Sequence, residues 1–559
     1  MQALTRWFRR QSTWIESQQA SILSAATIIF IANVASSFAG LIKNRVLSSI
    51  YIHPAFNDGK VLEAYFVAFR APEFAFQLII LGSLSAAFVP LFSQRYLNDE
   101  KKAFAFANQT MFLLMSVFVV ASIAILLFTP QFVGLLTGNS FEPDLAQQAI
   151  TMTRIMVLAQ LFFGLSGFIS AMLQSVKRFI IPAFSPLFYN FGIIVMTLFA
   201  HQWLGIYAAA WGTVLGAGLH MLVQIPLLFK IGYRFSIWPE WDKSDMTEFF
   251  SLTAPRTLAL GVSQLNLWVV TFFATSMGGI ALTMITFGQQ LMSIPIRFFG
   301  VSIGQAALPF LSAEQHDIVG FRRTVYRSLR QIFFFAAPAS VLLLVLRVPA
   351  VRLAYGTQEF PWRNTLITAE TVGILALSIA PQAATHLLMR AFYALNNTLA
   401  PLFAAVFYLV TTALLGWFFT IYLNYELSGV AYALTIAATL ETIVLLAALI
   451  WKIGLGDVRE LFSSLLRITS AAFLMAVTLF VFQRLLDLYV FETSRTLQLL
   501  QLTLSVTLMG SAVYLTLCWL FRIEELTILA RIFKKIRQGW SKVSKFTPTF
   551  LESVSGSEN

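Results

Sequence analysis

Charged side chains interrupt a long apolar stretch near the start of the chain, between Ser36 and Pro90. They include Lys43, Arg45, Glu63, Arg70 and Glu73. A charge at the middle of a membrane costs about 2.5–3.5 kcal/mol on insertion scales, so several charges need a wet cavity or a charged ligand to face. Arginine binds phosphate bidentately and lysine binds it as a point charge. The stretch therefore predicts the wall of a polar, anion-binding chamber inside a membrane protein.

Other ionisable residues fall inside later apolar segments. Arg256 and Arg297 are cations, and Glu441 is a carboxylate that is a candidate for an ion site. Structural alternatives stay open, because Lys43 can extend to the membrane surface, Glu63 can pair with it, and Glu441 can pair with a neighbouring helix. The five histidines lack metal-ligand spacing, and the chain has no nucleotide-binding loop or nucleophile motif. We therefore expect no metal, no cofactor and no enzyme.

The composition of the chain indicates a membrane protein. The chain has 559 residues, of which 58% are hydrophobic and only 11% charged, whereas soluble domains are about 25% charged. Its net charge of +12 does not indicate nucleic-acid binding, because the cations lie in short loops and at both ends of the chain. This distribution is typical of a polytopic membrane protein, which we expect to be a monomer.

A membrane span needs about 20 mostly apolar residues. On that rule the chain contains fourteen candidate segments, at residues 21–42, 62–92, 103–128, 150–175, 183–203, 205–229, 249–275, 280–311, 331–348, 366–391, 400–422, 428–451, 463–486 and 497–521. Lysine and arginine favour the cytoplasmic side, which predicts that both termini are cytoplasmic. The connection from Thr129 to Ile150 has neither residue and is expected outside.

The chain also carries an internal repeat. The run AAFVPLFS ending at Ser93 is similar to QAALPFLS ending at Ser312, and LQSVKRFIIP from Leu173 is similar to FYALNNTLAP from Phe392. Both pairs are 219 positions apart, and GIYAA and GVAYA follow at nearly the same offset. We expect two six-helix lobes, 21–229 and 249–451, related by a pseudo-twofold axis along the membrane normal. Two more helices (463–521), an amphipathic cytoplasmic segment (1–20) and a basic cytoplasmic tail (522–559) complete the predicted all-α fold.

Several motifs resemble the MurJ (MviN) family of lipid II flippases. They are EAYFVAFRAP from Glu63, SLSAAFVPLFS from Ser83, RFIIPAFSP from Arg178, RAFYALNNT from Arg390, SQLN from Ser263 and AALPFLS ending at Ser312. The resemblance implies the fold of the multidrug, oligosaccharidyl-lipid and polysaccharide exporter superfamily, with the last two helices forming a groove for a lipid tail. It also implies transport of an undecaprenyl-pyrophosphate-linked peptidoglycan precursor.

The resemblance also suggests which residues line the cavity. Lys43 stands where the family has an arginine, Glu63 stands for an aspartate, and Arg70 keeps a positive charge. Ser37, Phe76 and Gln290 occupy positions where the family commonly has arginine, and Gln289 and Ser293 replace carboxylates common in some members. The predicted substrate-binding residues are Ser37, Lys43, Glu63, Arg70, Arg256, Gln290 and Arg297, and the ion-coupling candidates are Glu63 and Glu441.

We therefore expect a lipid II flippase that works by alternating access in a bacterial inner membrane, with membrane lipids and other cell-wall synthesis proteins as partners. Two alternative functions stay open. A cation-coupled drug or metabolite antiporter of the same fold would use Glu63 or Glu441 as its ion site, although such a protein is expected to have twelve spans. A non-transporting paralogue that scaffolds cell-wall enzymes would account for the missing cavity charges.

Overall fold

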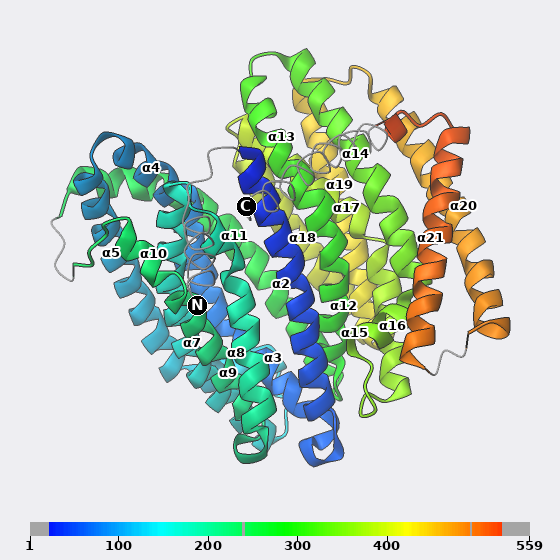
Figure 1. Ribbon diagram of the computed structural model, residues 1–559, viewed down its shortest axis with the longest axis horizontal. Coiled ribbons are helices and arrows are strands. Elements are labelled where there is room, and N and C mark those ends of the chain that lie inside the picture. Colours follow the sequence, from blue (N-terminus) through cyan, green and yellow to red (C-terminus); the bar gives the residue numbers. More distant parts are fainter. Residues whose placement is uncertain (1–21, 237–240, 492–494, 528–559) are drawn as a thin grey trace, which may run out of the picture. The chain divides into compact units, whose positions relative to one another are not determined.

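The computed structural model describes residues 22–236, 241–491 and 495–527, and this part of the chain is helical with no strand (Figure 1). The elements before residue 237 are α2 (Ile22–Tyr51), η1 (Pro54–Gly59), α3 (Lys60–Phe76), η2 (Gln77–Leu81), η3 (Leu84–Phe88), α4 (Val89–Asn98), α5 (Glu100–Leu127), α6 (Thr129–Thr137), α7 (Pro143–Ser175), α8 (Ile180–Leu204), α9 (Tyr207–Leu222) and α10 (Ile225–Lys230). The later elements are α11 (Lys243–Ser276), α12 (Ala281–Pro295), η4 (Ile296–Val301), α13 (Ser302–Ala313), α14 (Ile318–Val345), α15 (Arg347–Tyr355), α16 (Trp362–Ala376), α17 (Ile379–Ala394), α18 (Leu399–Trp417), η5 (Phe418–Tyr422), α19 (Glu426–Ile453), α20 (Val458–Tyr489) and α21 (Thr496–Leu520). The expected segment 1–20 and most of the expected tail 522–559 lie outside the described residues.

Eleven of the described helices are long and apolar enough to cross a membrane, and twelve are if α16 and α17, which meet at 46°, form one bent span. Residues 22–42 of the first expected segment lie within α2, and the expected segment 249–275 lies within α11; these helices have 30 and 34 residues. The described residues of the other expected segments are also mostly helical. The prediction of an all-α, multi-pass membrane protein is confirmed, and the count of fourteen is consistent with these helices.

The chain divides into two compact units. The first comprises residues 1–294, 347–378 and 396–446, and the second comprises residues 295–346, 379–395 and 447–559. These units do not coincide with the lobes expected from the repeat, 21–229 and 249–451, so those boundaries stay a prediction.

Within the first unit, α8 packs closely against both α9 and α2, and α7 packs against α3 and α9. Small residues allow the closest approach, because Gly192 on α8 faces the backbone of Gly216 on α9. This packing holds α2, α3, α7 and α8 together, and these four helices carry most of the polar residues described below.

In the second unit, α14 packs against α17 and α20, and α20 packs against α21. The Tyr514 hydroxyl donates a hydrogen bond to the Phe334 carbonyl over 2.9 Å. At one end of these helices the Arg330 guanidinium lies within 4 Å of three carboxylates, those of Glu460, Glu524 and Glu525. These contacts attach the last two helices to α14.

The repeat is also visible in local structure. The helix that begins with α3 changes to π-helix at Gln77–Leu81, and the helix that begins with α12 changes to π-helix at Ile296–Val301, 219 positions later. Proline follows both segments, as Pro90 in α4 and Pro309 in α13. Because π-helix is rare, its recurrence at this offset supports the repeat, although the two other π-helical segments of the described chain, Leu84–Phe88 and Phe418–Tyr422, have no counterpart at this offset.

Candidate functional site: a polar chamber, a gate and a vestibule

The first unit contains a cavity of about 340 Å³ that we call the polar chamber. Its walls come from α2, α3, α7, α8 and α12, and are formed by Lys43, Tyr65, Phe66, Phe69, Arg70, Glu73, Phe76, Gln160, Phe163, Tyr189 and Thr286. Two of the predicted substrate-binding residues, Lys43 and Arg70, therefore line the same cavity, and their contact with a substrate stays a prediction.

Three charged groups define the chamber. The Arg70 guanidinium donates from Nε to the Thr271 hydroxyl over 2.9 Å, which leaves its other N–H groups for further bonds. Glu73 lies one helical turn after Arg70 and interacts electrostatically with both Arg70 and Lys43. No ion pair within 4 Å joins these groups, and the Lys43 ammonium makes no hydrogen bond to any residue that the structure describes. The chamber thus holds two cations and one carboxylate with space between them.

Two neutral polar side chains in the chamber wall also lack partners among the described residues. Gln160 on α7 is only 4% exposed, and its Oε1 makes no hydrogen bond, nor does the hydroxyl of Thr286 on α12. Buried polar atoms are rarely left unpaired. Neither residue was predicted from the sequence, because a single neutral polar residue in an apolar helix resembles many structural ones.

Glu63 joins two of the helices that form the chamber wall. Its side chain is 1% exposed, and its Oε1 accepts hydrogen bonds from the backbone N–H groups of Leu282, at 2.5 Å, and Thr283, at 3.4 Å. These are among the first N–H groups of α12, which have no partner within the helix and favour a negative charge. Glu63 therefore joins the start of α3 to the start of α12. The alternative in which Glu63 pairs with Lys43 is not seen.

Three aromatic rings lie next to this contact between α3 and α12. Phe66 meets Phe287 edge to face at 6.3 Å, and Phe287 stacks on Tyr355 with ring centroids 4.1 Å apart. The Tyr355 hydroxyl donates to the Phe287 carbonyl over 3.1 Å. We call Glu63, these three rings and the first turn of α12 the gate.

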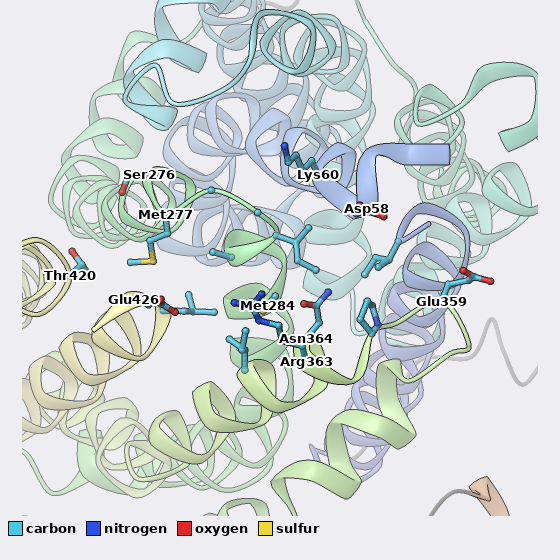
Figure 2. Close-up of a pocket in the computed structure, with 18 of the residues that line it drawn as sticks. Asp58, Lys60, Ser276, Met277, Met284, Glu359, Arg363, Asn364, Thr420 and Glu426 are labelled. Atoms are coloured by element: carbon cyan, nitrogen blue, oxygen red, sulfur yellow. The ribbon is translucent and has the colours of Figure 1, made fainter. Parts of the chain in front are cut away.

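A larger cavity of about 1300 Å³, which we call the vestibule, lies beyond the gate. Figure 2 shows side chains from several separate segments around it, and those that are labelled include Asp58, Lys60, Glu359, Arg363 and Glu426. Lys60 lines the vestibule at the first residue of α3, whereas Arg70 lines the chamber further along the same helix. On α12, Met284 faces the vestibule and Thr286 faces the chamber. On α3, Glu63 lies between Lys60 and Arg70, and its carboxylate contacts the start of α12.

Comparisons with known proteins identify the family of this chain. The sequence model of the family described as "Lipid II flippase MurJ" matches residues 52–499. The chain belongs to the MurJ family. A probable MurJ of Bdellovibrio bacteriovorus is 25% identical over 533 residues, covering 93% of this chain and 99% of the relative. The MurJ of Burkholderia cenocepacia is 26% identical, covering 71% of this chain and 78% of the relative.

Solved structures show the same fold. A structure titled "Lipid II flippase MurJ, inward closed conformation" superposes with a TM-score of 0.70 at 22% identity, covering 87% of this chain and 98% of that one. An inward-facing multidrug transporter of the MATE family gives 0.63 at 15% identity, covering 77% of this chain and 98% of that one. The resemblance to the MurJ family and to its superfamily fold is therefore confirmed.

The remaining predicted binding residues of this MurJ homologue lie outside the chamber wall. The Gln290 Oε1 atom accepts hydrogen bonds from Asn44 Nδ2 and from the Tyr355 hydroxyl. Gln290 therefore holds α12 against α2 and against Tyr355 of the gate. The Ser37 hydroxyl bonds the Asn33 carbonyl in its own helix. Arg297 is exposed on η4 in the second unit, and Arg256 belongs to α11 with its side chain outside the described part. Substrate contacts by these residues stay predictions.

Glu441 lies in a separate buried cluster of the first unit. It is 6% exposed on α19 and lies near Tyr408 of α18. Tyr408 is also close to Asn266 and Thr412, whose Oδ1 and Oγ1 atoms lack hydrogen-bond partners. A buried carboxylate beside unpaired oxygen atoms is suited to holding a cation, so Glu441 remains the ion-site candidate.

Proposed function

We propose that this protein moves a lipid-linked, anionic peptidoglycan precursor from the inner to the outer leaflet of a bacterial inner membrane. The observation that carries the proposal is a chamber in which Lys43 and Arg70 line the same cavity without an ion pair between them and Glu73. The gate is proposed as the barrier between this chamber and the vestibule. Curated relatives with the name lipid II flippase support the choice of substrate.

The chamber supplies the chemistry that such a substrate needs. A pyrophosphate carries about two negative charges, and its oxygens would bind between the Lys43 ammonium and the free N–H groups of Arg70. Transport then requires the Glu63 carboxylate to leave the start of α12, so that the head group passes into the vestibule. The lipid tail would stay in the membrane beside α20 and α21.

An ion gradient would supply the driving force at Glu441. Binding of a cation among Glu441, Tyr408 and Asn266 would pair the buried carboxylate and satisfy the Asn266 carbonyl. Glu63 is less suited to this role, because its Oε1 already accepts two backbone hydrogen bonds.

Transport can be measured with purified protein in liposomes that carry fluorescent lipid II. We expect Lys43→Ala and Arg70→Ala each to reduce the initial flipping rate at least tenfold, since charge-assisted hydrogen bonds contribute about 1.5–3 kcal/mol each. Lys452→Ala, at an exposed position at the end of α19, serves as the control and should keep the wild-type rate.

The same experiment tests the two alternative functions, a scaffold for cell-wall enzymes and a cation-coupled antiporter. Wild-type protein that moves no lipid II but binds cell-wall enzymes would indicate the scaffold. Wild-type protein that exchanges a drug for a cation without moving lipid II would indicate the antiporter.

A further inference from the structure

The polar chamber contains more hydrogen-bond acceptors than a phosphate can use. Phosphate oxygens need donors, which Lys43 and Arg70 supply, whereas the Glu73 carboxylate and the Gln160 Oε1 are acceptors. A carboxylate near the two cations also weakens the binding of a bare anion. The site therefore fits a ligand in which a phosphate is attached to a group with O–H or N–H donors.

Resting on the proposed function, we infer that Glu73 and Gln160 recognise the first sugar attached to the pyrophosphate. The sugar's hydroxyl or acetamido N–H groups would donate to the Glu73 carboxylate and to Gln160 Oε1, which is buried without a partner. A pocket of about 340 Å³ is at the small end of ligand-binding pockets. It has room for a phosphate and about one sugar ring, while the rest of the head group would extend beyond it.

Glu73 makes the chamber favour a glycosylated lipid over one that carries a bare pyrophosphate. It lies near Lys43 and Arg70 without a direct ion pair, so a ligand without donors would leave the carboxylate unpaired beside its phosphate. A glycosyl phosphate would satisfy both sides of the chamber. The chamber should therefore discriminate against lipid carriers that have lost their sugar, which are also present in the membrane after the head group has been used.

The test compares the affinities of the purified full-length protein for two probes, undecaprenyl pyrophosphate and the same lipid carrying one N-acetylhexosamine. Wild-type protein should bind the glycosylated lipid about tenfold more tightly, which is the effect of one charge-assisted hydrogen bond. Gln160→Leu and Glu73→Gln should each reduce this ratio toward one, and Glu73→Gln should bind the bare pyrophosphate lipid more tightly than wild type does.

Gln148→Leu is the matched control. Gln148 is on α7 like Gln160 and also has an unpartnered Oε1, but it lies outside the chamber wall, so its ratio should equal that of wild type. Equal wild-type affinities for the two lipids, or an unchanged ratio in both chamber variants, would overturn the inference while leaving the proposed function intact. No binding of either lipid by wild-type protein would overturn both.

Discussion

At the scale of single residues, the cation at position 43 should matter more than its identity as lysine. Lys43→Arg keeps the positive charge and adds a planar guanidinium that can bind two phosphate oxygens at once. We expect this variant to flip lipid II at the wild-type rate or faster, and Lys43→Gln to lose at least nine-tenths of the rate, in the liposome assay. A Lys43→Gln protein that transports normally would place the phosphate elsewhere.

The second residue-scale prediction concerns Glu63. Glu63→Gln keeps the size of the side chain but removes the charge that favours the start of α12. The predicted topology, with a cytoplasmic N-terminus before α2, places the start of α3 and the vestibule on the outer side. The gate should open more often, so a cysteine replacing Thr286, in the chamber wall, should react about ten times faster with a membrane-impermeant thiol reagent added outside cells.

Two controls accompany that experiment. Cys518 must be replaced to remove its background, although it is buried. Glu142→Gln, which breaks the pair between Glu142 and Lys60 at 3.0 Å, should leave the labelling rate at position 286 unchanged. Equal labelling rates with and without the Glu63→Gln substitution would show that this carboxylate does not hold the gate closed.

The sequence identified charged residues better than neutral ones. Lys43 and Arg70 were both noticeable in the sequence, because a cation in an apolar helix is costly unless it faces a cavity or a charged partner, and both line the chamber. Glu73 is noticeable as a charge, yet its position beside both cations depends on how α2 packs against α3, which one sequence does not specify. Gln290 is a neutral residue whose structural role the sequence did not indicate, because its hydrogen-bond partner Asn44 lies 246 positions away in the chain.

At the scale of elements, the contact between α8 and α9 depends on glycine. A Cβ at Gly216 would collide with the Tyr189 carbonyl, whereas a Cβ at Gly218 on the same helix would meet nothing within 4 Å. Gly216→Ala should therefore lower stability by about 1–3 kcal/mol, and Gly218→Ala should change it little.

Thermal unfolding of the two purified variants, followed by tryptophan fluorescence in detergent, measures this difference. Because Tyr189 lines the polar chamber, Gly216→Ala should also weaken lipid II binding. Unfolding of both variants at the wild-type temperature would mean that the two helices can separate without cost.

The sequence predicted the existence of the helices well and their interruptions poorly. Long apolar runs indicated the spans, but no local signal marks where Gln77–Leu81 and Ile296–Val301 adopt π-helix.

At the scale of the whole molecule, the lysine and arginine distribution predicts cytoplasmic termini. Cysteines at Gln147 on α7 and Ser244 on α11, both exposed, test this in a protein without Cys518. An impermeant thiol reagent should label Gln147→Cys in intact cells and Ser244→Cys only after the membrane is permeabilised. The opposite labelling pattern would show that the termini lie outside, and the proposed direction of transport would then be reversed.

The gate contact has a consequence for the two copies of the repeat. Glu63 and Leu282 are 219 residues apart, so the carboxylate touches the position that corresponds to its own in the second copy of the repeat. A carboxylate at both positions would bring two negative charges together there, and these would repel. The contact with the backbone of α12 therefore requires an acidic residue in one copy only, and the apolar Leu282 in the other copy meets that requirement.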